Sequence, residues 1–442
     1  MNMTAGVEAA VEAGCSQYDI LSQFYERLRR PTLRRAMPNL NPTAEERLEN
    51  RPRHRRFWRF AHPIARLFAK LRYNYSYDDL SGIEPPYLLV CNHVLNLDPV
   101  LVGVAMGRQG YFVATENLLH LGIVTKLLMR YLCPIIIQKG NVSLRSLREI
   151  LKTIAGGASV ALFPEGDRSF DGLTGPIPPA TAKIARKAGK LVCVRFEGGY
   201  LTYPRWATTQ RRGRLHLHLS GVYDADAMAA MSDDELASVI DRDLHEDAYA
   251  RQAQIAAAEG APVRFRGRHL ALGMESTLFI CPACGGVSTL RSDDAGIRCT
   301  DPGCGFSARY TEEGYLEGGR FRTITEWDAW QRGELERIIK ESGPNDPLFS
   351  DHVTLERYDA DHNLTSSTPG TLTAFAFFVQ FTPDASPDEP VCVSLDQVVG
   401  VGIFLRNTLI AHVGKPVKHF EVRGDRGFNA LKYRYVYKAV GK

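Results

Sequence analysis

The sequence lacks any long hydrophobic run. Its 442 residues contain no stretch of about 18 consecutive apolar residues, the length that a transmembrane helix needs. The best candidate, Leu121–Gln138, is interrupted by Lys126 and Arg130. The N-terminal residues carry Glu8 and Glu12 and lack the basic-then-apolar order of a secretory signal. We therefore expect neither a transmembrane helix nor a secretory signal.

Cysteine and net charge are also scarce. The nine cysteines are an odd number and only four of them cluster, which favours one metal site in a reducing cytosol over a disulfide framework. The apolar share of 44% and the charged share of 24% exclude a mainly disordered, collagenous or coiled-coil chain. The net charge is only +4, and the length predicts about three domains.

What positive excess there is lies near the N-terminus. The segment Arg51–Arg72 has no acidic residue and carries the basic residues Arg51, Arg53, Arg55, Arg56, Arg59, Arg66, Lys70 and Arg72. Helical periodicity would place on one face Phe57, Phe60, Ile64, Leu67, Phe68 and Leu71. We predict a basic extension over residues 1–74 whose amphipathic helix binds an anionic membrane surface. A helix packed on a neighbouring domain, with its arginines solvated, would show the same pattern.

Residues 75–260 alternate short apolar runs with helical stretches. Buried strands are expected at Tyr87–Cys91, Tyr111–Ala114, Pro134–Gln138, Ser159–Phe163 and Leu191–Phe196. Helices are expected at Asp98–Met106, Glu116–Tyr131, Ser143–Ala155 and Pro178–Ala188, and a capping box at Ser232 begins a long helix to about Ala258. This rhythm predicts an α/β domain with a largely parallel sheet.

Two polar motifs follow buried strands of this domain. His93 and Asp98 lie in Asn92-His-Val-Leu-Asn-Leu-Asp98, where a carboxylate could orient an imidazole that takes a proton from a hydroxyl. A capping aspartate beside a solvated histidine would look the same. The second motif is Phe163-Pro-Glu-Gly-Asp-Arg-Ser169, in which Gly166 allows close backbone approach and Arg168 could bind a phosphate. A polar loop with an internal Glu165–Arg168 pair is the alternative.

Together the two motifs resemble those of the glycerolipid acyltransferase family, NHxxxxD and FPEGxRS, in the same order and about 70 residues apart. The resemblance covers about residues 80–255. It implies an α/β acyltransferase domain in which His93 is the general base and Asp98 orients it. It also implies that Lys139, Glu165, Gly166 and Arg168 bind the polar head of the acceptor. The acyl donor would be acyl-CoA or acyl-carrier protein, and the acceptor a lysophosphatidate-like lysophospholipid.

The chain departs from the family pattern in three places. Asp167 stands where the third motif usually has threonine, which adds a negative charge near the expected phosphate. Lys139 replaces the arginine of the second motif and keeps the charge without the planar fork. The fourth motif, at Leu191–Val194, lacks its proline. These departures weaken the case for glycerol-3-phosphate chemistry in particular.

The clustered cysteines predict a zinc site. Cys281 and Cys284 form one close pair, and Cys299 and Cys304 form another, with glycines at the expected turns. Four thiolates in this spacing suit a tetrahedral structural zinc ion, so residues 276–325 are expected to form a zinc ribbon. The module has few basic residues, which argues against nucleic acid as a partner. Four unrelated thiols are the alternative.

Residues 345–442 contain strand-like runs followed by a helix at Phe428–Ala439, an order that resembles a PH/GRAM-like β domain. The leading hypothesis is a phospholipid-synthesis or remodelling acyltransferase, cytoplasmic and peripheral on the inner face of the cell membrane. A membrane-recruitment adaptor on an acyltransferase-like scaffold is one alternative. A zinc-ribbon nucleic-acid-binding protein with a basic arm is another.

Overall fold

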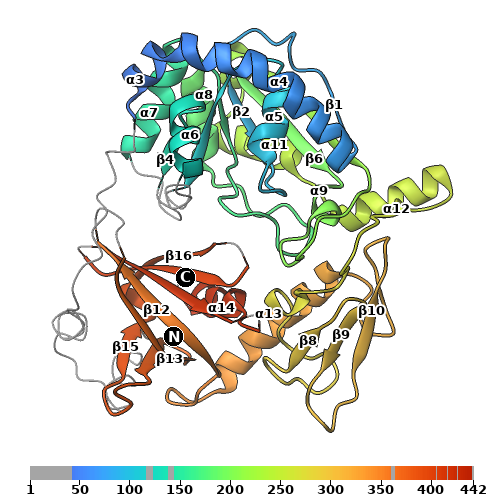
Figure 1. Ribbon diagram of the computed structural model, residues 1–442, viewed down its shortest axis with the longest axis vertical. Coiled ribbons are helices and arrows are strands. Elements are labelled where there is room, and N and C mark those ends of the chain that lie inside the picture. The colour runs from blue at the N-terminus through green and yellow to red at the C-terminus, as the bar shows by residue number, and fades with distance from the viewer. Residues whose placement is uncertain are drawn as a thin grey trace. The chain divides into compact units, whose positions relative to one another are not determined.

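The computed structural model describes residues 42–115, 123–137, 144–359, 364–404, 406–415, 417–425 and 427–440. The chain folds as two compact units, which are drawn together in Figure 1. One contains Asn39–Arg268 with Glu312–Gly314, and the other contains His269–Thr311 and Tyr315–Lys442. Each unit is described by itself.

The first unit is built on a mostly parallel sheet with the strand order β1-β7-β6-β2-β5-β3-β4. Its strands are β1 (Tyr75–Tyr77), β2 (Leu88–Cys91), β3 (Tyr111–Thr115), β4 (Ile135–Ile137), β5 (Val160–Leu162), β6 (Leu191–Glu197) and β7 (Leu215–Tyr223). Strand β2 pairs in parallel with both β5 and β6. The polar segments that follow β2 and β5 therefore leave the sheet side by side, at the edge where open α/β sheets bind ligands.

Helices cover both faces of the sheet around β2, β3, β4 and β5, which explains why these four strands are apolar at almost every position. Alternate residues of β2 face two separate cores: Leu89 packs with side chains of α4 and α5, whereas Leu88 packs with side chains of α7, α8 and α11. The helices of the unit are α3 (Ala44–Glu49), α4 (Arg51–Tyr73), α5 (Asp98–Met106), α6 (Ile123–Tyr131), α7 (Leu144–Ala155), α8 (Ala180–Ala188), α9 (Gly199–Thr202), α10 (Ala225–Ala229), α11 (Asp233–Leu244) and α12 (Ala248–Glu259). The α/β architecture expected from the sequence is therefore present.

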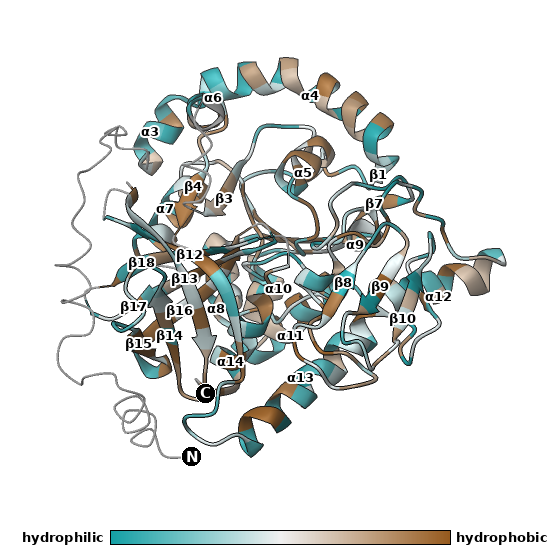
Figure 2. Cartoon of the chain, turned by 60° about the horizontal axis from the view of Figure 1, so that its bottom comes forward, coloured by the Kyte–Doolittle hydropathy of each residue, from teal (hydrophilic) through white to brown (hydrophobic). Residues whose placement is uncertain are grey.

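Helix α4 belongs to this unit and contacts α5 through one side only. His54, Trp58, Ala69 and Tyr73 are its buried residues. The Trp58 ring lies where a side chain at Gly103 of α5 would be, since a Cβ there would stand 2.9 Å from the indole. Figure 2 shows hydrophilic and hydrophobic residues alternating along α4. Among the residues that the structure describes, no helix is both long enough and apolar enough to cross a membrane.

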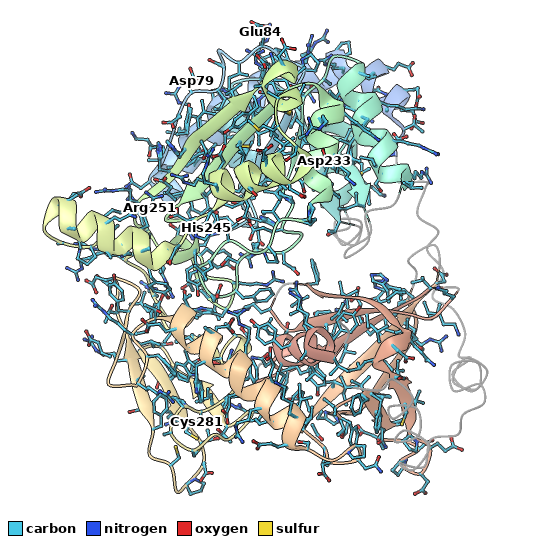
Figure 3. The ribbon with its side chains drawn as sticks, turned by 180° about the vertical axis from the view of Figure 1, so that it is seen from behind. Asp79, Glu84, Asp233, His245, Arg251 and Cys281 are labelled. Carbon is cyan, nitrogen blue, oxygen red and sulfur yellow. The ribbon has the colours of Figure 1, made fainter. Side chains whose placement is uncertain are left out.

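The long helix expected from Ser232 to about Ala258 is interrupted. The capping box of Ser232 and Glu235 begins α11 as predicted, but α11 ends at Leu244 and His245 is extended. Asp247 then begins α12, because its side chain accepts the backbone N–H groups of Tyr249 and Ala250. His245 is labelled in Figure 3.

The second unit combines the cysteine module with a β-rich region. The module has η2 (Met274–Ser276) and a sheet of order β11-β10-β9-β8, formed by β8 (Leu290–Ser292), β9 (Gly296–Cys299), β10 (Ser307–Tyr310) and β11 (Leu316–Glu317). Helix α13 (Ile324–Glu341) follows. A capping box of Thr323 and Glu326, a signal that is visible in the sequence, marks its start.

The β-rich region is an antiparallel curled sheet of order β15-β14-β13-β12-β18-β17-β16. Its elements are β12 (Phe349–Tyr358), β13 (Leu364–Ala374), β14 (Phe378–Pro383), β15 (Val391–Ser394), η3 (Leu395–Gln397), β16 (Val398–Phe404), β17 (Thr408–Val413), β18 (Lys418–Gly424) and α14 (Ala430–Val440). The apolar segment Thr371–Thr382, which reads as one strand in the sequence, contains the end of β13 and most of β14. The likeness to a PH/GRAM domain stays a prediction.

Candidate active site

The segment after β2 brings His93 and Asp98 together. Asp98 is the first residue of α5, and its fully buried side chain accepts at Oδ2 from Nδ1 of His93 at 2.7 Å. The same oxygen accepts the backbone N–H groups of Val94 at 2.7 Å and Leu95 at 2.9 Å. A carboxylate can only accept hydrogen bonds, so Nδ1 of His93 carries the proton and Nε2 keeps a lone pair. The imidazole is 24% exposed, so solvent reaches it.

The side chain of Glu165, in the second motif, accepts a hydrogen bond from the backbone of the first motif. Its Oε1 accepts the N–H of His93 and its Oε2 accepts the N–H of Gly175, both at 2.6 Å. The carbonyl of His93 in turn accepts the N–H of Ser169 at 3.0 Å. Glu165 therefore holds the backbone of His93, the general-base candidate, in place through a hydrogen bond. The predicted contact of Glu165 with the acceptor head group stays a prediction.

Burial raises the pKa of Glu165 to about 8, and the charges of Asp98 and Asp167 act in the same direction. The two N–H donors lower it only in part. Since the unfolded chain releases this proton near the ordinary value of about 4.5, unfolding releases a proton between pH 4.5 and 8.

We expect Glu165 to make the protein less stable as the pH rises. The thermal unfolding midpoint of the wild type, measured relative to that of Glu165→Gln, should fall between about pH 4.5 and 8, because the native state retains a proton that the unfolded chain has lost. A difference in midpoint that stays constant across this range would show that Glu165 is ionised in the native protein throughout.

Two other predicted acceptor-binding residues, Gly166 and Arg168, belong to the same loop as Glu165. Gly166 has a φ of 70° and no atom within 4 Å of where a Cβ would be, so the turn needs glycine for its backbone and not for space. Arg168 is only 7% exposed, and its guanidinium lies 5.4 Å from the ring centroid of Tyr203. Lys139 lies outside the described residues, so its predicted role stays a prediction.

Arg205 is a residue that our sequence reasoning missed. Its Nη1 donates to Oδ1 of Asp167 at 3.1 Å and to the carbonyl of Arg168 at 3.2 Å. Its guanidinium also lies 4.1 Å from the ring centroid of Phe170. The unusual Asp167 is thus paired with a cation from the segment after α9. Arg205 therefore neutralises the charge of Asp167 within the protein. The sequence signal for such a cation was the acidic residue at this position of the third motif.

We expect Arg205→Met to lower the free energy of unfolding by about 3–5 kcal/mol, because it removes the cation that pairs with the largely buried carboxylate of Asp167. The side chains of the pair are 5% and 11% exposed. The matched control is Arg214→Met, whose pair with Glu259 is 50% exposed on both sides, so that its loss should change the free energy of unfolding little. Equal losses in the two variants, measured by chemical denaturation, would contradict this role for Arg205.

The cysteine module brings its four predicted ligands into one cluster. The sulfur atoms of Cys281 and Cys304 are 3.6 Å apart, and those of Cys284 and Cys299 are 3.8 Å apart. All four lie within 4.8 Å of one another. A tetrahedral site with Zn–S bonds of about 2.3 Å separates its sulfurs by about 3.8 Å, so this donor set fits zinc. Cys281 is labelled in Figure 3.

Residues 65–204 match the family model described as acyltransferase. This span contains both motifs and the strands β2 and β5 that bring them together. This part of the chain is similar to acyltransferase-family domains. The coarse fold and enzyme class expected from the two motifs are therefore supported.

A chloroplastic 1-acyl-sn-glycerol-3-phosphate acyltransferase of Brassica napus is 29% identical to the chain over 139 residues. The match covers 30% of this chain and 40% of that protein, so the chain spans less than half of this curated relative. The crystal structure of the lysophosphatidate acyltransferase PlsC from Thermotoga maritima is 20% identical, with a TM-score of 0.38, and covers 57% of this chain and 95% of its own. A C-terminal domain of an unknown protein from Leishmania infantum is 10% identical, with a TM-score of 0.16, and covers 25% and 97%.

Proposed function

We propose that this protein is a glycerolipid O-acyltransferase that moves a fatty acyl group from acyl-CoA or acyl-carrier protein to the hydroxyl of a lysophospholipid. The observation that carries the proposal is the 2.7 Å contact between His93 Nδ1 and the buried carboxylate of Asp98, at the edge of the sheet that also bears the second motif. The acyltransferase family match of the same span supports it.

The chemistry needs one base and no covalent enzyme intermediate. Nε2 of His93 takes the proton from the acceptor hydroxyl as its oxygen attacks the thioester carbonyl. Asp98 stabilises the imidazolium that forms. The tetrahedral intermediate then expels the thiolate, which takes the proton back from His93. Cys91 is fully buried and burial raises the pKa of its thiol, so it is not a candidate nucleophile.

Acceptor recognition is proposed for the loop after β5. Arg168 and Lys139 would hold the anionic head group, with the exposed turn at Gly166 allowing close approach. The charge of Asp167 does not oppose this, because Arg205 pairs with it. Glu165 would act indirectly, by fixing the backbone of His93.

The test is an acyl-transfer assay on the full chain. Lysophosphatidate, other lysophospholipids and glycerol-3-phosphate would each be offered with acyl-CoA or acyl-carrier protein, and the products identified by mass spectrometry. We expect ester formation with a lysophospholipid. A protein that binds vesicles but forms no ester with any pair would instead be a membrane-recruitment adaptor.

The four cysteines are proposed to hold a structural zinc ion. With four thiolate ligands no position remains for water, so the ion would contribute folding free energy to the module and no chemistry. Chelation should unfold the module within residues 276–325 while leaving the acyl-transfer chemistry of the other unit in place. Circular dichroism and limited proteolysis measure the unfolding of the module, and an acyl-transfer assay on the same samples measures turnover.

Two results would count against the zinc prediction. Protein purified without chelator could contain no zinc and have four freely titratable thiols, which would remove the site. Alternatively, chelation could abolish turnover before any unfolding, which would make the ion more than structural.

The membrane location is proposed from α4. Its large apolar side chains Phe60, Ile64, Leu67, Phe68 and Leu71 are between 47% and 71% exposed. They are interspersed with exposed basic residues, among them Arg55, Arg56 and Arg59. An anionic bilayer matches both the charge and the apolar character of this face. A peripheral enzyme on the cytoplasmic face of the membrane would meet its amphiphilic acceptor there.

A further inference from the structure

A second cluster of possible metal ligands lies in the first unit, on strands that the proposed chemistry does not use. His216 and His218 are alternate residues of β7 and therefore point to the same face of the sheet. Asp78 directly follows β1, whose Tyr77 pairs in parallel with Leu217. Three residues from two neighbouring strands are thereby brought to one place.

The distances in this cluster suit a divalent metal ion. Nε2 of His216 lies 3.4 Å from Oδ1 of Asp78, and Nδ1 of His218 lies 3.1 Å from Oδ2. The three ligand atoms all lie within 4.8 Å of one another. Bonds of about 2.0–2.1 Å in a tetrahedral site would place neighbouring N and O ligands about 3.3 Å apart. The residues therefore stand near the spacing that a bound ion requires.

A serine fixes the orientation of one imidazole. Oγ of Ser76 donates to the carbonyl of Leu215 at 3.4 Å and lies 2.9 Å from Nδ1 of His216. In the tautomer that suits metal binding, Nδ1–H of His216 donates to Oγ of Ser76 while the hydroxyl proton goes to the carbonyl. In the neutral ring Nε2 then carries a lone pair directed at Asp78. Ligating histidines are usually held in this way through their other ring nitrogen.

The charges around the cluster are balanced, and solvent reaches it. His218 and His216 pair across the strands with Arg195 and Glu197 of β6, and these two side chains form an ion pair at 3.2 Å. The side chains of Asp78, His216 and His218 are 41%, 28% and 39% exposed. His216 also lines a pocket of about 250 Å³. Water can therefore complete the coordination of an ion held by three protein ligands.

We propose that Asp78, His216 and His218 bind a first-row divalent metal ion, with Zn²⁺ the expected occupant. Two imidazoles and one carboxylate form a donor set that zinc prefers and that the hard ions Ca²⁺ and Mg²⁺ do not. The ion would join the three-residue strand β1 to β7. Only Asn74 separates β1 from α4, so the site would also fasten the C-terminal end of α4 to the sheet. The proposal does not depend on acyl transfer.

The competing explanation is a proton in place of the metal. If His216 and His218 are protonated, both can form ion pairs with Asp78 without any ion. The two explanations differ in whether the residues take up metal at neutral pH, and a direct binding experiment separates them.

The experiment uses the full untagged chain, purified with its cysteine-bound metal and titrated with Co²⁺. Cobalt bound by nitrogen and oxygen gives weak visible bands, whereas cobalt bound by thiolates adds intense ultraviolet absorption, so the cysteine module is observed separately. We expect one equivalent to bind without thiolate absorption, and to raise the thermal unfolding midpoint. His218→Ala and Asp78→Asn should lose this equivalent, and Ser76→Ala should weaken it about 10–100-fold.

The matched control is His352→Ala, because His352 lies 2.9 Å from Asp384 in an exposed pair that no third ligand joins among the described residues. It should bind cobalt as the wild type does. The proposal fails if the wild type takes up no cobalt outside the thiolates. It also fails if folded His218→Ala and Asp78→Asn, checked by circular dichroism, bind the ion with unchanged affinity.

Discussion

His93→Ala should lower acyl transfer by roughly 10²–10⁴-fold, the usual loss when a general base is removed. The reason is geometric: Nδ1 of His93 donates to the buried Oδ2 of Asp98, which leaves Nε2 as the proton acceptor. Turnover with a lysophospholipid and acyl-CoA measures the effect. The loss should fall on kcat, since the imidazole contributes to the transition state rather than to acceptor binding.

Asp98→Asn tests the orienting role of the carboxylate in the pair of His93 and Asp98. An amide at this position can donate to Nδ1 and hold the imidazole in the other tautomer, so activity should fall although the ring remains. His352→Ala, an exposed histidine of the second unit, is the control and should leave turnover unchanged. Wild-type turnover in folded His93→Ala protein would overturn the mechanism.

The sequence could predict those parts of the site that depend on local patterns, namely the buried strands and the polar motifs that follow them. The apolar runs around β2 and β5 identify buried strands, and each polar motif directly follows its strand. Parallel strands of an open sheet direct their carboxyl ends to one edge, so the sequence predicts that His93 and Glu165 lie at the same edge. That β2 and β5 are direct neighbours depends on strand order, which only the structure gives.

The remainder depends on contacts between residues far apart in the chain. Asp167 and Arg205 are separated by 38 positions, and nothing in the spacing says that they pair. The bond from Gly175 to Glu165 likewise belongs to the folded loop. Other misses were local signals left unused: Asp247 as the cap of α12, and Thr323 with Glu326 as the capping box of α13.

Helix α4 shows how a correct pattern can leave its use open. The periodicity placed Phe60, Ile64 and Leu67 on one face, and an apolar face usually packs on a core. Here the buried residues of the helix are instead His54, Trp58, Ala69 and Tyr73. Of the predicted apolar face, Phe57 stacks on Tyr131 of α6, whereas the residues from Phe60 to Leu71 are exposed, which a packing helix does not explain. Membrane binding is the proposal that accounts for both faces.

Replacing Arg55, Arg56 and Arg59 by glutamine should weaken binding to anionic vesicles about 100-fold at low salt. The estimate follows from about 1 kcal/mol for each basic residue near such a surface, and screening reduces it as salt rises. Arg53 is left in place because its guanidinium donates to the carbonyl of Arg130, so its loss would also disturb packing. Vesicle sedimentation with anionic and neutral lipids measures the effect, and neutral vesicles should change little.

The apolar face of α4 should act independently of charge. Changing Phe60, Ile64 and Leu67 to serine removes side chains that are each 60–71% exposed, so the fold should be retained while salt-resistant binding is lost. Each such side chain contributes about 1.5–3 kcal/mol when it leaves water for the bilayer.

A control for the arginine variant removes the same number of positive charges elsewhere on the surface. It changes Arg145, Arg148 and Lys187, exposed on α7 and α8, to glutamine. If that control weakens vesicle binding as much as the α4 variants do, attraction is a property of overall charge and α4 is not the membrane-binding element.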